Sequence, residues 1–422
     1  MSYKPERGRL AISSARSRRN SPGTLQLERQ FSLRLASQFL YGLGDWVYSL
    51  AVVVLAYHLG GGLAAAAAVL LLQAGGRLLA VTFGAQLRLA ARPRALIPVF
   101  ELLRAGLIAA LIFVTSRDQL WVAMSVAMLL GLLGPVIESA RHANLTRHRC
   151  PEEAHSLRAR CVRRWDQLAM IAGSISGGAL IVLWSEQPAF VLAALASLAA
   201  TLFAVASGAL RPVNGGRQPA APAGGEPTDG SPGAVRVLLL ALAGGAALGI
   251  SIRVLLIDIV LDEHAGTELI YGLFIALAGV GAFAGPLAVP RLLGKLPSEF
   301  VLGGVTAALA VALMAAHLAD PLALAIPVII GCGVLAITAE RAGETVVRRL
   351  IPDRELDRAL HLLATTTIAG QVVALAVVAG LGYLSNVTAI VVSLIVMSTV
   401  CAALPILMYI RGGSRSAVSG GD

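Results

Sequence analysis

Charged side chains stand inside long apolar stretches of this sequence, among them Asp45, Arg77 and Arg253. A charge at the depth of a lipid bilayer costs at least about 2.5 kcal/mol on insertion scales, so each is a functional hypothesis by default. Asp45 could exchange a proton or hold a cation, and Arg77, at a similar depth on the next stretch, could pair with it. Gln73 lies one helical turn before Arg77 and shares its face. The alternative is a structural ion pair that joins two helices.

Arg253 interrupts the apolar segment ISIRVLLIDIV. An unpaired guanidinium there would be very unfavourable, so we expect it to face an internal cavity and to meet an anion, either a carboxylate such as Asp258 or a bound ligand. The alternative is that its long side chain reaches the outer membrane surface. Gln371 is a further polar candidate for the cavity, although amides in such stretches more often hold helices together.

Carboxylates and arginines also gather where apolar stretches end on one side of the expected bundle. Glu101 and Arg104 are spaced i, i+3, which predicts a local pair, and Glu138 and Arg141 share that spacing. Such groups could form a cytoplasmic gate whose contacts break and re-form, or they could only end helices at the membrane surface. The candidate gate residues are Glu101, Arg104, Glu138, Arg141, Asp166, Glu340, Arg341 and Glu344.

The elements that must position these residues are apolar stretches of roughly 20 residues, the length at which a helix crosses a bilayer. Breaks in hydrophobicity predict twelve such spans in an all-α integral membrane protein. They lie at about 35–58, 64–87, 96–115, 120–141, 167–185, 189–210, 235–259, 269–289, 300–317, 322–341, 361–384 and 387–410.

The distribution of Lys and Arg sets the direction of the chain. Apart from Arg77, Arg104 and Arg253 inside spans, the basic residues fall before the first span, after the last span or in gaps that follow even-numbered spans, and Arg117 is the exception. By the positive-inside rule, both termini are cytoplasmic. The net charge of +10 is spread over the cytoplasmic segments. This pattern favours contact with membrane lipids over nucleic-acid binding.

Composition and motifs argue against an enzyme. The chain is 57% hydrophobic and 14% charged, which excludes a soluble globule. It contains no phosphate-binding loop, zinc-protease motif or nucleophile elbow in a plausible setting, so no cofactor is expected. The His and Cys residues of 142–161 match no close-paired zinc spacing, and an Arg-rich amphipathic helix accounts for that segment better than a metal site.

The chain divides into two halves with one plan. The Pro/Gly-rich segment after the sixth span predicts a flexible linker, and PVIESARHANLTRHRCPEEAHSLRAR resembles VLAITAERAGETVVRRLIPDRELDRAL in the other half. We expect a cytoplasmic basic arm at 1–34, six-helix bundles at 35–210 and 235–410, a linker at 211–234 and a cytoplasmic tail at 411–422. The bundles would be pseudosymmetric, with substrate at their interface.

The local sequences resemble the major facilitator superfamily. LYGLGDWVYSLAVVVLAY and the segment 131–178 are similar to its drug-efflux (macrolide/enterobactin exporter-like) branch. The loop after the second span departs from the family pattern, because Arg88 stands where an acid is typical. On the fifth span Gly173 is followed by Ser174 where the antiporter pattern has Pro. Both departures weaken an inference of proton-driven antiport.

The resemblance implies a monomeric secondary transporter that exports a small amphipathic organic compound, with protons as the candidate coupling ion. Basic residues that are almost all Arg suggest a bacterial source, and so an inner-membrane location. Two alternatives stay open: an importer or lipid flippase of the same fold, and a membrane scaffold or sensor that transports nothing. The sequence does not specify the substrate, the direction of transport or the coupling ion.

Overall fold

The computed structural model describes residues 22–87, 93–146, 152–207, 232–263, 266–293, 298–317, 325–350, 356–383 and 387–418. Within these ranges the chain forms the α-helices α2 to α13 and short helical segments η1 to η3. The first half contains α2 (Pro22–Gly60), α3 (Leu63–Leu87), α4 (Pro93–Ala110), η1 (Leu111–Phe113), η2 (Arg117–Gln119), α5 (Leu120–Thr146), α6 (Glu152–Leu183) and α7 (Glu186–Ala206). The second half contains α8 (Pro232–Asp258), η3 (Ile259–Glu263), α9 (Glu268–Leu293), α10 (Ser298–His317), α11 (Ala325–Leu350), α12 (Leu356–Gly382) and α13 (Val387–Val418).

The sequence explains why these segments are helices and where several of them start and turn. A helix satisfies its backbone hydrogen bonds internally, as an apolar environment requires. α2, α4 and α8 each begin at a proline, which lacks the N–H that a first helical turn leaves unpaired. The tight turn from α2 to α3 uses Gly61 and Gly62 at φ of 79° and 125°, a backbone region that favours glycine.

Each of the twelve predicted spans overlaps one of the helices α2 to α13. Nine of these helices, as far as the structure describes them, are long and apolar enough to cross a membrane. α10 and α13 contribute shorter apolar stretches, Val301–Ala312 and Val387–Cys401. α4 carries the charges of Glu101 and Arg104. The fold is therefore that of an all-helical membrane protein.

Several helices begin or end away from the predicted boundaries. α2 begins at Pro22, so residues 22–34, predicted to belong to an arm, are helical. α13 continues to Val418, so most of the predicted tail extends the last helix. α7 ends at Ala206, four residues before the predicted end of its span. Residues 1–21 and most of the predicted linker lie outside the described residues.

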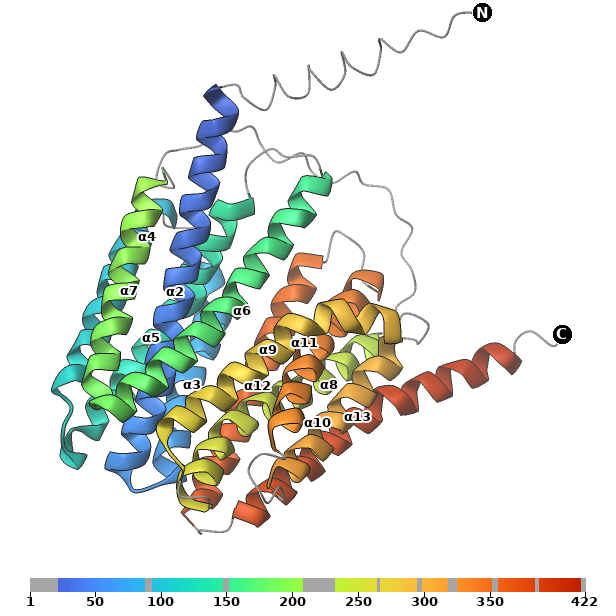
Figure 1. Cartoon of the computed structure of the whole chain (residues 1–422). Helices are drawn as coiled ribbons and strands as arrows, with labels where there is room; N and C mark the ends of the chain where they lie inside the picture. Colours follow the sequence, from blue (N-terminus) through green and yellow to red (C-terminus); the bar gives the residue numbers. More distant parts are fainter. Residues whose placement is uncertain are drawn as a thin grey trace, which may run out of the picture.

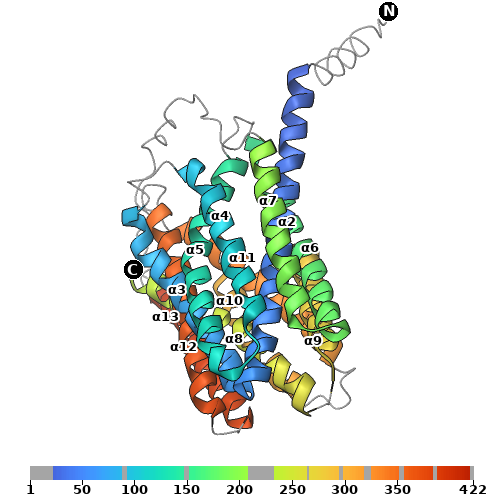
Figure 2. The same cartoon turned by 90° about the vertical axis from the view of Figure 1, so that its left-hand side faces the viewer.

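The helices of each half pack in the same pattern (Figure 1). α2 packs against α6 and α7, α3 against α5, and α4 against α7. In the second half, α8 packs against α12 and α13, α9 against α11, and α10 against α13. The two halves meet along α6 with α9 and along α3 with α12. α2 projects beyond its neighbours at its amino-terminal end, which we call the near end, and the opposite end is the far end (Figures 1 and 2).

Glycines permit the closest helix crossings in both halves. A Cβ atom on Gly76 of α3 or Gly131 of α5 would collide with the backbone of the other helix. Gly281 of α9 and Gly333 of α11 stand in the same relation. Small residues are what let apolar helices approach this closely.

Candidate functional site

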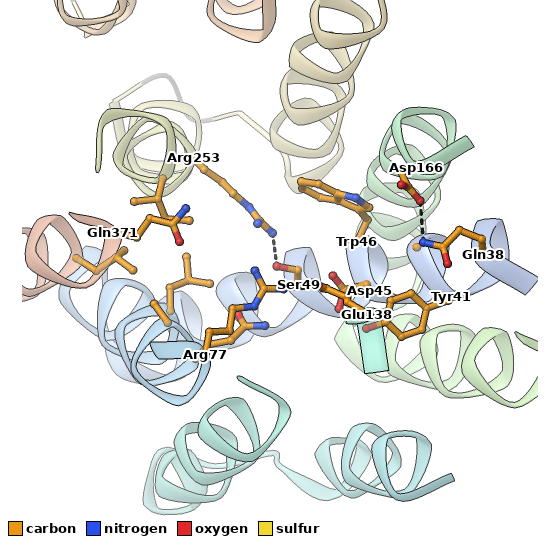
Figure 3. A pocket seen from close by; sticks show the side chains of 16 residues that line it. Gln38, Tyr41, Asp45, Trp46, Ser49, Arg77, Glu138, Asp166, Arg253 and Gln371 are labelled. Carbon is orange, nitrogen blue, oxygen red and sulfur yellow. Dashed lines mark hydrogen bonds and ion pairs between the residues drawn. The ribbon is translucent and has the colours of Figure 1, made fainter. Parts of the chain in front are cut away.

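A cavity of about 330 Å³ lies between the two halves (Figure 3). Its walls come from α2, α3, α5 and α6 of the first half and from α8 and α12 of the second. The lining residues are Gln38, Tyr41, Gly42, Asp45, Trp46, Ser49, Leu70, Gln73, Ala74, Arg77, Glu138, Asp166, Ile250, Arg253, Gln371 and Leu375. All five predicted substrate or coupling residues, Asp45, Arg77, Gln73, Arg253 and Gln371, therefore line one cavity.

Asp45 pairs with Arg104, and the predicted ion pair with Arg77 is wrong. An Nη2 of Arg104, on α4, donates to a carboxylate oxygen of Asp45 at 2.9 Å. The side chain of Arg104 is 4% exposed, whereas that of Asp45 is 30% exposed toward the cavity. The sequence could not indicate this partner, because depth along two consecutive helices does not tell which other helix brings a charged side chain within reach.

Arg104 belongs to a network of buried side chains that continues away from the cavity. Arg104 lies over the ring of Tyr41 at 4.2 Å, and Arg141 lies over the same ring at 4.5 Å. Arg141 donates through Nε to Glu101 at 2.6 Å, and Thr201 donates to the other carboxylate oxygen of Glu101 at 2.7 Å. The predicted local pair of Glu101 and Arg104 is thus replaced by pairs between helices. The network makes Asp45 the cavity-facing end of a fixed chain of charges.

Arg77 pairs instead with Glu138 of α5. Their side chains approach to 3.5 Å, and both line the cavity. The two side chains are 34% and 42% exposed, so this ion pair is more accessible to water than the buried pair of Arg141 and Glu101. The spacing of Glu138 and Arg141 did not make them partners, because Glu138 turns to the cavity and Arg141 to the buried network.

Arg253 faces the cavity, as the first of its two predicted alternatives required. Its Nη2 donates to the hydroxyl of Ser49 on α2, and its guanidinium lies 4.8 Å from the ring centre of Trp46 (Figure 3). Asp258, the predicted carboxylate partner, accepts a hydrogen bond from the Tyr57 hydroxyl at 3.1 Å. The hydroxyl of Tyr271 donates to the backbone carbonyl of Arg253 at 3.1 Å and so ties α9 to α8 at this point.

Two contacts join the halves at the far end, beyond Arg253. Tyr57 of α2 reaches Asp258 of α8. His58 lies 2.9 Å from Glu186 of α7 and 3.5 Å from Glu268 of α9. Ser49 is about 12 Å along α2 from Tyr57, at 1.5 Å per residue, so these contacts lie beyond the cavity toward the far end. The sequence analysis did not predict these far-end contacts, because their residues lie on different helices and share no regular spacing.

At the near end, only part of the predicted gate joins the halves in the described residues. Glu340 of α11 lies 3.3 Å from Arg163 of α6, which was not among the candidates. Glu101, Arg104, Glu138 and Arg141 make the contacts above within the first half. Asp166 accepts a hydrogen bond from Gln38 of α2 at 2.9 Å. Arg341 also lies on α11, and the side chain of Glu344 lies outside the described residues.

Several lining residues were missed although the sequence carried a signal for them. Gln38, Tyr41 and Ser49 stand at helical spacing on either side of the predicted Asp45 along α2 and line the same cavity. A search for polar residues three or four apart within apolar stretches would have found this stripe. Among the described residues, no group of three His, Cys, Asp or Glu side chains is placed to hold a metal ion.

No family model and no curated protein matches the sequence. Solved structures do match in fold. A transporter of the POT family in complex with 5-aminolevulinic acid superposes with a TM-score of 0.70 at 12% identity, covering 90% of this chain and 96% of the other. A bacterial homologue of the iron transporter ferroportin, in an inward-facing state, gives 0.62 at 18% identity, covering 90% and 98%. The chain therefore shares the fold of these solved structures, which are transporters and not enzymes.

Proposed function

We propose that this protein is a secondary active transporter that moves an amphipathic organic compound out of a bacterial cytoplasm by rocker-switch alternating access. The moving parts are the bundles 35–210 and 235–410, which rock about the cavity between them. The protein sits in the inner membrane as a monomer, with twelve spans and both termini, hence the near end, in the cytoplasm. We assign it to the drug-efflux branch of the major facilitator superfamily.

The single observation that carries the proposal is a cavity whose walls come from both halves, beside contacts that join the halves at the far end. Arg253 and Gln371 enter the cavity from the second half, while Asp45 and Arg77 enter from the first. A ligand there touches both moving parts at once. Because Tyr57–Asp258 and His58–Glu268 close the far end, the conformation fits loading from the cytoplasm.

The lining fits an amphipathic compound better than a sugar. Leu70, Ala74, Ile250 and Leu375 supply apolar surface. Two of the acids, Asp45 and Glu138, are occupied by Arg104 and Arg77. A polyhydroxylated substrate needs many free hydrogen-bonding groups, whereas such a pocket orients a largely apolar one through a few polar contacts.

Asp45 is the proposed coupling residue, with protons as the coupling ion. Its carboxylate is reached from the cavity and is held by the buried Arg104. Protonation would remove the charge that this guanidinium binds and so would loosen α2 from α4. A substrate and a proton could then influence each other through one helix, α2, which lines the cavity and carries the far-end contacts.

Transport in proteoliposomes tests the proposal. The purified chain is reconstituted with fluorescent amphipathic probes of positive, zero and negative charge, and flux is followed under imposed pH and voltage gradients. We expect at least one probe to move, and Asp45→Asn to lower pH-driven flux at least about tenfold while leaving counterflow exchange intact, since exchange needs no net proton movement.

The matched control is Asp118→Asn, which neutralises an exposed carboxylate in η2 far from the cavity and should leave flux unchanged. Absence of flux for every probe under both gradients would refute transport and favour a scaffold. Equal pH dependence in the wild type and Asp45→Asn would refute the coupling role alone.

A further inference from the structure

Charge is distributed unevenly across the cavity. The lining acids, Asp45, Glu138 and Asp166, all come from the first half. The second half contributes Arg253, Gln371 and two apolar side chains, Ile250 and Leu375. The two walls therefore offer a ligand different chemistry.

Arg253 differs from the other arginines at this site in what compensates its charge. Arg77 and Arg104 each lie within ion-pair distance of a carboxylate. Among the residues that the structure describes, Arg253 has no such carboxylate; it donates to the neutral hydroxyl of Ser49 and packs on the Trp46 ring. Its Nε atom is buried and has no hydrogen-bond partner among the described residues. A guanidinium inside an apolar span that meets only neutral groups is costly, and a bound anion would relieve the cost.

The surroundings of Arg253 select a particular kind of anion. A guanidinium presents its N–H groups as a planar fork that fits a carboxylate. Ile250, one helical turn earlier on α8, and Leu70 and Leu375 line the same cavity with apolar surface. The Tyr271 hydroxyl bond fixes the backbone that carries the guanidinium. The site thus combines a positioned cation with an apolar wall.

We propose that the transported compound is an amphipathic organic anion whose carboxylate binds Arg253 and whose apolar body packs against Ile250, Leu70 and Leu375. This inference rests on the proposed transport function and names its substrate class. Because Arg253 belongs to the second half and its partners Ser49 and Trp46 to the first, the bound carboxylate sits where the two halves meet.

Binding measured without transport tests the inference. Isothermal titration of the purified full chain, in one detergent and at fixed ionic strength, compares phenylbutyrate with phenylbutyramide and phenylbutylamine, which share a body and differ in the head group. We expect the acid to bind at least about tenfold tighter than the amide, as hydrogen bonds to a charged group imply. Arg253→Gln should reduce that preference to about twofold or less while the amide still binds, and Arg253→Lys should retain part of it.

The control is Arg117→Gln, which removes an exposed charge in η2 and should keep the wild-type preference. The inference is overturned if the wild type binds the amide or the amine as well as the acid, or if Arg253→Gln keeps the preference for the acid. Selective acid binding without flux in proteoliposomes would refute transport and leave the anion site standing. Flux of neutral or cationic probes, together with no preference for the acid in binding, would support transport and refute the anion site.

Discussion

The two halves of the molecule repeat their packing but not their chemistry. α2 packs on α6 and α7 as α8 packs on α12 and α13. The glycine crossing of α3 and α5, at Gly76 and Gly131, recurs between α9 and α11, at Gly281 and Gly333. The helix crossings thus follow the same rule in both halves.

The first half adds a buried ion pair to the helix-bound hydroxyls that both halves contain, such as Ser197 in the first. In the first, Glu101 and Arg141 form an ion pair between helices. In the described part of the second, the buried hydroxyls of Ser251, Thr306 and Thr338 each donate to a carbonyl of their own helix. Close packing needs only small residues at crossings, whereas a binding site needs unlike groups on its two walls. In our proposal, the first half fixes a charge array and the second offers Arg253 to a ligand.

The largest expected difference is in the free energy of unfolding after substitution of Glu101 or of Thr306. These residues lie on the third helix of the first and the second half, respectively. Glu101→Gln leaves the Arg141 guanidinium buried without its counter-charge, and we expect a loss of about 3 to 5 kcal/mol of unfolding free energy. Thr306→Val removes a bond within one helix and should cost about 1 kcal/mol or less. Titration with sodium dodecyl sulfate in mixed micelles measures both. Equal losses would mean that the charge network does not distinguish the halves.

A smaller effect, equal in both halves, is expected at the glycine crossings. Gly131→Ala and Gly333→Ala each place a methyl group against the backbone of the neighbouring helix, and each should cost about 2 to 3 kcal/mol. Gly75→Ala and Gly331→Ala are matched controls, because no atom lies within 4 Å of a Cβ built there. The controls should be neutral or slightly stabilising, since alanine favours the helix. A loss confined to one half would break the proposed repeat of packing.

The sequence predicted the elements well because hydrophobic length and charge placement are local properties. Each predicted span overlaps a helix, and the five predicted substrate or coupling residues line one cavity. Pairing is not local. Asp45 of α2 pairs with Arg104 of α4, and Glu101 of α4 pairs with Arg141 of α5, because the bundle brings side chains of separate helices within reach of one another. Spacing rules see only neighbours on one helix, so they proposed Glu101 with Arg104.

The contact of Tyr57 with Asp258 links the two halves at the far end, and its loss should have a moderate effect. Tyr57→Phe removes one hydrogen bond of 3.1 Å, worth about 0.5 to 1.5 kcal/mol, so far-end opening should become about two- to tenfold more frequent. In a background without native cysteines, Ser49→Cys reports opening through its reaction rate with an impermeant thiol reagent from the far side. Tyr383→Phe, at an exposed tyrosine after α12, is the control and should not change the rate. An unchanged rate in Tyr57→Phe would show that the halves separate without breaking this contact.

The smallest effect is expected where Arg163 meets Glu340 at the near end. Both side chains are substantially exposed, at 39% and 57%, so water and salt screen the pair at 3.3 Å. A double-mutant cycle with Arg163→Gln and Glu340→Gln should give a coupling of about 0 to 1 kcal/mol that weakens as salt rises. The buried pair of Arg141 and Glu101, measured by the same cycle, should couple more strongly and respond less to salt. The near-end pair could instead prove as strong and as salt-resistant as the buried pair. The contact of Arg163 with Glu340 would then be permanent, and rocking of the halves would have to break a different near-end contact.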